Sequence, residues 1–96
     1  MDSATAQAMV DRAAIKAGEL GVAACVAVVD GGAHLVSFKR MDGAILGAID
    51  VSQRKARTAV LFPMETGEFG QLVADEQLIG MELSNGGLAL FHGGLP

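Results

Sequence analysis

The sequence VAACVAVVDGGAHLVSFKR, residues 22–40, decides the fold. Its first part, residues 22–30, contains small and β-branched apolar residues on both faces, which is typical of a covered or central strand. Residues 30–33 (DGGA) form a glycine turn, and residues 34–40 continue with alternating side chains after it. The segment therefore predicts an antiparallel β-hairpin.

A helical repeat precedes the hairpin. Residues 3–20 place apolar side chains at three- and four-residue intervals, the spacing of an amphipathic helix. Ser3 or Thr5 is the expected N-cap, because a hydroxyl can accept a backbone N–H bond there, and Gly21 suits the left-handed position after the last turn. The apolar side chains are mainly alanines, so we expect this helix to lie close against the sheet.

Three further elements follow the hairpin. Residues 44–62 repeat apolar side chains at helical spacing until Pro63 ends the pattern, residues 65–74 form a shorter helix, and residues 88–91 (LALF) form a third strand. The order α-β-β-α-α-β predicts an α+β fold in which helices flank an antiparallel sheet. No linker or repeat divides the chain, so residues 1–96 are expected to form a single domain.

Composition and charge bound the function. The chain is 51% hydrophobic and 19% charged, which predicts a folded core. Its formal net charge of −4 argues against nucleic acid as the main partner. Three of the seven basic residues cluster at Arg54, Lys55 and Arg57, either as a solvated helix face or as an anion-binding patch. Chains this short often rely on oligomerisation for stability.

The sequence gives no indication of export or of a membrane. Its N-terminus has no basic segment before an apolar core, and no apolar run reaches the roughly 20 residues of a membrane span. The lone Cys25 cannot form an internal disulfide and is expected to be a small buried hydrophobe. We therefore predict a cytoplasmic protein.

The C-terminal sequence LSNGGLALFHGGLP, residues 83–96, raises a question about the sheet. Gly93-Gly94 form a turn after the strand predicted at 88–91, and a hairpin turn normally leads into another strand. We expect a second polypeptide to supply that strand, because an open slot in a sheet leaves backbone N–H and C=O groups without partners.

Two segments resemble the GlcG/HbpS family of haem-degrading domains, which includes the C-terminal domain of PduO proteins. They are VAVVDGGAHLVSFKRMDGAILGAIDVSQRKARTA (residues 26–59) and SNGGLALFHGGLP (residues 84–96). The resemblance implies a profilin- or PAS-like α+β fold with five antiparallel strands, and self-association into homo- or hetero-oligomers. It also implies that the last strand lies centrally, beside the first. This chain departs from the family pattern by lacking that strand and the helix after it.

The resemblance indicates candidate ligand residues as well. Asp30, Arg40, Asp42 and Lys55 resemble the rim of the family's ligand cleft, and a lysine near carboxylates can bind an anionic group or, when desolvated, act as a base. The alternative is structural: the two aspartates cap turns and the basic residues pair with them. The candidates for a catalytic role are Lys55, Asp30 and Asn85.

Glycine-rich turns and histidines supply further candidates. Asn85-Gly86-Gly87 and Gly93-Gly94 can present successive backbone N–H groups to a carboxylate or phosphate, or can simply form turns. His34 and His92 are candidate haem ligands or ordinary surface residues. No zinc-ligand spacing is visible, so we predict no other metal site. The ligand is expected between the first hairpin and the Asn85 turn.

Three functions are compatible with the sequence. The first is a subunit that binds haem, another tetrapyrrole or a small carboxylate and is completed by a second chain. The second is one chain of an enzyme matured by cleavage after Pro96, with a nucleophile or a pocket wall on the partner chain. The third is a subunit with an assembly role only. Haem is a candidate cofactor, and the sequence does not identify the ligand further.

Overall fold

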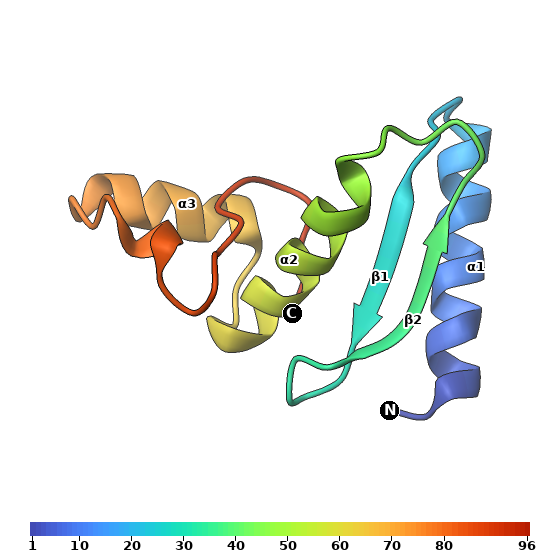
Figure 1. Ribbon diagram of the computed structural model, residues 1–96, viewed down its shortest axis with the longest axis horizontal. Coiled ribbons are helices and arrows are strands. Elements are labelled where there is room, and N and C mark those ends of the chain that lie inside the picture. Colours follow the sequence, from blue (N-terminus) through green and yellow to red (C-terminus); the bar gives the residue numbers. More distant parts are fainter.

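The computed structural model describes all 96 residues, and its central feature is the hairpin (Figure 1). β1 (Cys25–Val29) pairs antiparallel with β2 (Leu35–Arg40), as the sequence predicts. At the turn, Oδ1 of Asp30 accepts the backbone N–H groups of Gly32 and His34 at 2.9 and 3.0 Å. An aspartate side chain thus replaces a backbone acceptor and fixes the turn.

The first helix, α1 (Ser3–Glu19), lies along one face of the hairpin (Figure 1). Its buried side chains form one stripe at four-residue spacing: Ala6, Val10 and Ala14. Because residues four apart stack on one face of a helix, this stripe is continuous. Two alanines and a valine leave little bulk between helix and sheet, so the close approach expected from the sequence is confirmed.

The start of α1 differs from the prediction. The side chain of Asp2, and not that of Ser3 or Thr5, caps the helix by accepting the backbone N–H of Thr5 at 2.7 Å. An aspartate also places negative charge where the helix dipole favours it. Gly21 follows the helix with a φ of 71°, the left-handed conformation that was predicted.

The second helix, α2 (Ala48–Leu61), lies beside the hairpin and contacts β1 (Figure 1). Its predicted start at residue 44 is too early, because residues 44–47 form a turn. Ile45 and Leu46 are exposed in that turn, and no side chain caps the helix. Their apolar spacing imitates one more helical turn, which explains the error.

Residues 62–92 form a C-terminal lobe on the far side of α2 from the hairpin, and residues 1–61 form an N-terminal body (Figure 1). The lobe contains α3 (Thr66–Asp75), close to the helix predicted over 65–74, and a short 3₁₀ helix, η1 (Met81–Leu83). Its buried core consists of Phe69, Val73 and Leu88. The N-terminal body has no aromatic residue in its helical stripe, so the two parts have differently built cores.

The predicted third strand at residues 88–91 is wrong. The segment pairs with no strand. The backbone N–H of Ala89 donates to Oγ1 of Thr58 at 3.1 Å, and the carbonyl of Phe91 accepts a bond from Oγ1 of Thr66 at 2.5 Å. The apolar run therefore marks a partly buried segment. Its backbone bonds to hydroxyl groups on two helices and not to a neighbouring strand.

The sheet has two strands, so the outer edge of β1 is unpaired. All five residues of β1 are half-buried, which leaves a strand edge partly shielded from water without a backbone partner. The α+β class is confirmed, and these residues do not by themselves form the five-stranded sheet that the resemblance implies. None of the helices combines the length and the apolar character that a membrane crossing requires.

Candidate functional site

A groove of about 690 Å³ follows the inner part of β1. Met9 and Ala13 of α1 form one wall, α2 forms the opposite wall, and residues 23–27 lie between them. Ser52 and Lys55 are the polar side chains in a lining that is otherwise apolar or glycine. An apolar cleft of this size with a few polar groups is the usual form of a ligand site.

The last four residues of the sequence, 93–96, line the same groove next to Lys55. Two glycines allow this close approach: a Cβ on Gly93 would lie 2.9 Å from Lys55 Nζ, and a Cβ on Gly94 would lie 2.6 Å from the Lys55 carbonyl oxygen. Nζ of Lys55 also lies 4.7 Å from the ring centroid of Phe91, within cation–π range. The glycine pair thus brings an aromatic ring and a cation together at one end of the groove.

The anion nest predicted at Gly93-Gly94 is occupied by the chain itself. The backbone N–H of Gly93 donates to Oε2 of Glu65 at 3.0 Å, and that of Gly94 donates to Oγ1 of Thr66 at 2.9 Å. The N–H of Gly93 thus binds a carboxylate of the chain itself, whereas the N–H of Gly94 binds a hydroxyl. They are not free to bind a ligand.

Glu65 caps α3 and accepts several hydrogen bonds. Four hydrogen-bond donors, the backbone N–H groups of Gly93 and Gly67, the imidazole of His92 and the backbone N–H of Glu68, together lower the pKa of Glu65 to about 2. A carboxylate that accepts this many donors is stabilised in its charged form. Glu65 is therefore ionised throughout the physiological range and acts only as an acceptor.

His92 is held by this carboxylate. Its Nδ1 lies 2.7 Å from Oε1 of Glu65, while 85% of its side chain is exposed. The sequence contains no local signal for this pair, because 27 positions separate the two residues. Only the place of Glu65, at the start of the helix predicted over 65–74, suggests that its side chain accepts hydrogen bonds.

His34 and Asp30 form a second histidine–carboxylate pair at the hairpin turn. Nδ1 of His34 lies 3.5 Å from Oδ1 of Asp30, and the side chain of His34 is 83% exposed. The backbone N–H groups of His34 and Gly32 lower the pKa of Asp30. The turn-capping interpretation of Asp30 is thus observed, and neither residue lines the groove.

Arg40 and Asp42 lie at the opposite end of the hairpin from Asp30, and both are exposed. The ion pairs of the structure involve neither Arg40 nor Lys55, so the alternative in which these bases pair with Asp30 or Asp42 is not observed. Arg40 and Asp42 do not line the groove either. Of the predicted rim, only Lys55 lies in it.

The turn at Asn85-Gly86-Gly87 has three consecutive residues with positive φ, from 53° to 104°. Its carbonyl groups face Arg54, which donates to the Gly86 carbonyl oxygen at 2.7 Å and pairs with Asp50 at 2.6 Å. The turn therefore presents acceptors to an arginine of its own chain. This observation favours the structural interpretation of Arg54 within the predicted basic cluster.

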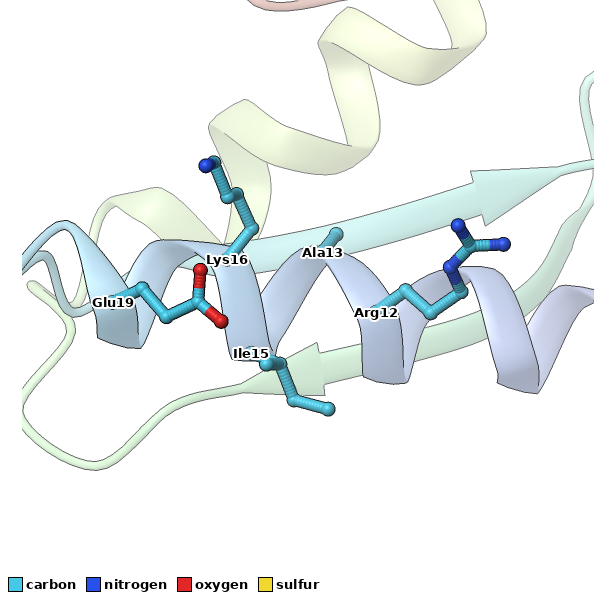
Figure 2. Close-up of a pocket in the computed structure, with 5 residues that line it drawn as sticks. All are labelled: Arg12, Ala13, Ile15, Lys16 and Glu19. Atoms are coloured by element: carbon cyan, nitrogen blue, oxygen red, sulfur yellow. The ribbon is translucent and has the colours of Figure 1, made fainter.

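Two other features are less suited to ligand binding. Figure 2 shows a shallow hollow on α1 whose lining side chains all come from that helix and point in different directions.

No group of three histidine, cysteine or acidic side chains is placed to hold a metal ion. Cys25, expected to be buried, is half-buried and lines the groove.

The residues at the Lys55 end of the groove fit a haem-type ligand in two respects. The walls are apolar, and Lys55 offers a cation to a carboxylate. A haem has an apolar macrocycle and two carboxylates, so each of these groups has a matching feature, whereas no histidine lines the groove to match the iron.

Fold and groove together define a small α+β domain with a free strand edge beside an apolar groove. The model of the HbpS-like family, whose description is "Haem degrading protein HbpS-like", matches residues 1–96 of this chain. The chain belongs to this family. A 15.0 kDa protein from Citrobacter freundii, encoded between dhaT and dhaS, is 35% identical over 95 residues, which are 97% of this chain and 67% of that protein.

Solved structures support the same assignment. The ORFY protein of Klebsiella pneumoniae is 36% identical with a TM-score of 0.93 over 100% of this chain and 68% of its own. An HbpS double mutant from Streptomyces reticuli is 27% identical with a TM-score of 0.80, over 88% of this chain and 57% of its own. A PduOC:Heme complex is 29% identical with a TM-score of 0.82, over 93% of this chain and 67% of its own. The chain thus spans 57% to 68% of these three chains.

Proposed function

We propose that this chain is a subunit of an oligomeric protein that binds haem, another tetrapyrrole or a small carboxylate. A second polypeptide completes the fold by adding a strand to β1, and the ligand occupies the Lys55 end of the groove. The observation on which this proposal rests is the free, half-buried edge of β1 beside an apolar groove that ends in a lysine. The cytoplasmic location remains a prediction.

Two observations support a haem-like or carboxylate ligand: the residues that line the groove and the similarity to other members of the family. The family description refers to haem degradation, and one related structure is a complex with haem. In this chain, Lys55 is the one cationic side chain in the groove lining and is already held near Gly93 and Phe91. A cation fixed in place at the end of an apolar cleft favours a flat apolar ligand with a carboxylate.

The completing strand is supported by the surroundings of β1. Addition of an extended segment to an open edge satisfies the free backbone N–H and C=O groups and buries apolar side chains in the groove. Ala27, Cys25 and Ala23 leave room beside the strand because their side chains are short. A partner segment with alternating apolar side chains matches this surface, since every second side chain of a strand faces the same side.

Haem titration of the purified native assembly tests the ligand. A Soret band that shifts and saturates supports the haem form of the proposal, and an unchanged band rules that form out. Lys55→Gln is expected to weaken haem binding about tenfold, which corresponds to about 1.4 kcal/mol. It should leave binding of the haem dimethyl ester unchanged, because the ester has no carboxylate. Lys39→Gln, on an exposed position of β2, is the matched control.

The reactivity of Cys25, the only cysteine of the chain, can show whether a partner strand pairs with β1. Cys25 lines the groove, so a strand paired with β1 should slow its alkylation by iodoacetamide, and removal of the partner should restore the rate. Cys25→Ser confirms that the signal comes from this thiol. The completion proposal fails if the isolated chain sediments as a monomer and unfolds in one cooperative transition in calorimetry.

A further inference from the structure

The basic residues of α2 divide between two surfaces. Lys55 lines the groove, whereas Arg54 extends to the turn at residues 84–87 and donates to the Gly86 carbonyl oxygen at 2.7 Å. Asp50 pairs with Arg54 at 2.6 Å, so the charge of this arginine is compensated within the helix. Arg54 is therefore a structural link between α2 and the turn.

Arg57 approaches the same turn without a partner. A Cβ added to Gly86 would lie 4.0 Å from each of the two terminal nitrogens of Arg57, and no other atom of the arginine is as near. Arg57 takes part in no side-chain hydrogen bond and in no ion pair of the structure, although it is half-buried. Partial burial is unfavourable for an unpaired charge, and an anion at this position would compensate it.

The turn provides space and further donors beside this guanidinium group. Gly86 has a φ of 75°, a left-handed conformation that residues with a side chain seldom adopt, so the space next to Arg57 stays open. No hydrogen bond of the structure uses the backbone N–H of Asn85 or of Gly86, and both residues are exposed. Consecutive backbone N–H groups in a turn can form a concave site for an anion.

We propose that Arg57 and the turn at residues 84–87 bind the phosphate group of a small molecule. An arginine binds two oxygens of such a group through parallel N–H bonds. A phosphate has further oxygens for the backbone N–H groups, whereas a carboxylate uses both of its oxygens on the guanidinium group. The carboxylate of Glu82, close by in the sequence, is already bonded to the N–H of Gly80 at 3.0 and 3.1 Å.

This site is separate from the groove, because neither Arg57 nor any residue of the turn lines the groove. Phosphate binding here therefore does not depend on the ligand proposed for the groove, and either proposal can fail without the other.

The test is isothermal titration calorimetry of the native assembly with inorganic phosphate at constant ionic strength. Arg57→Gln should weaken phosphate binding at least about tenfold, because it removes the charge and both parallel donors. Arg57→Lys keeps the charge but not the pair of donors, so its loss should be smaller. Because Arg57 forms no bond within the protein, these replacements are not expected to prevent folding.

Two matched variants show where the phosphate binds. Arg12→Gln makes the same change at an exposed arginine of α1 that forms no ion pair, and Lys55→Gln removes the cation of the groove. Both should bind phosphate as the unmodified protein does. The proposal is overturned if the unmodified assembly binds no phosphate, or if either variant loses as much affinity as Arg57→Gln. Acetate that binds as tightly as phosphate, and with the same dependence on Arg57, would overturn the assignment of a phosphate group.

Discussion

The N-terminal body and the C-terminal lobe are stabilised in different ways. In the body, a strand ladder and a stripe of alanine and valine join elements that follow one another in the sequence. The segment after α3 is held instead by side-chain oxygens of Thr58 in α2 and of Glu65 and Thr66 at the start of α3, which bond to backbone groups 25 to 31 positions away. The comparison shows that local periodicity can specify a hairpin, whereas the lobe depends on a few polar groups that meet only after folding.

Two helical glycines provide the sharpest contrast between the parts. Gly70 in α3 packs against the carbonyl oxygen of Leu90, and a Cβ there would overlap it, while Gly18 in α1 has only Met41 Cε at 4.0 Å. Gly70→Ala is expected to destabilise the protein by about 3 kcal/mol, because a backbone atom must move. Gly18→Ala should instead stabilise it by about 0.5–1 kcal/mol through lower chain entropy in the unfolded state.

Urea unfolding of the native assembly measures both changes. Equal effects of the two substitutions would show that the lobe is no more tightly constrained than the body. A loss confined to the Gly70 variant would show that the backbone of residues 88–91 is pressed against α3, as the geometry indicates.

Two buried hydroxyls provide a smaller contrast, since that of Thr58 joins α2 to the lobe and that of Ser37 bonds within the body. Thr58 is fully buried, and Thr58→Val keeps its shape but leaves the N–H of the buried Ala89 without an acceptor. We expect a loss of about 2 kcal/mol, the usual cost of an unsatisfied buried donor. In the body, Ser37→Ala breaks a 3.0 Å bond to the exposed Gln7, whose amide can turn to water. That loss should be about 0.5 kcal/mol.

Thr58→Ser is the control, because it retains the hydroxyl and loses only a methyl group. If Thr58→Ser costs as much as Thr58→Val in the same unfolding measurement, packing rather than the bond to Ala89 accounts for the effect of Thr58.

The difference between the parts also explains what could be predicted from the sequence. The hairpin, α1 and the position of α3 follow from periodicity and turn residues, which act over a few positions. The third strand was wrong because an apolar run does not reveal whether its partner is a ladder or a pair of threonines. Even in the body, the cap of α1 was assigned to a hydroxyl when the neighbouring carboxylate of Asp2 takes that role.

In the candidate site, too, residues with a local sequence signal could be predicted, whereas residues whose roles depend on distant contacts could not. Lys55, Gly93 and Gly94 were predicted and do line the groove, because their surroundings in the sequence resemble a known pattern. Glu65 and Phe91 were missed, since their roles depend on contacts with His92 and Lys55 across the fold. Asp30, Arg40, Asp42 and the Asn85 turn lie outside the groove, and their roles in ligand binding remain predictions.

The smallest expected effect is the pH dependence of the two capping carboxylates. Glu65 has its pKa lowered from 4.5 to about 2, so its contribution to stability is complete above pH 4.5 and is lost as pH falls towards 2. The advantage in thermal midpoint of the unmodified protein over Glu65→Gln should be constant above pH 4.5 and shrink below it. Asp30, whose pKa is lowered from 3.8, should give the same sign in Asp30→Asn, confined to pH below 3.8. Because Asp30 holds only a turn, whereas Glu65 joins the start of α3 to residues 92 and 93, the Glu65 difference should be the larger one. Calorimetry across pH 2–7 measures both differences. A larger effect at Asp30 would show that its carboxylate in the body contributes more to stability than that of Glu65 in the lobe.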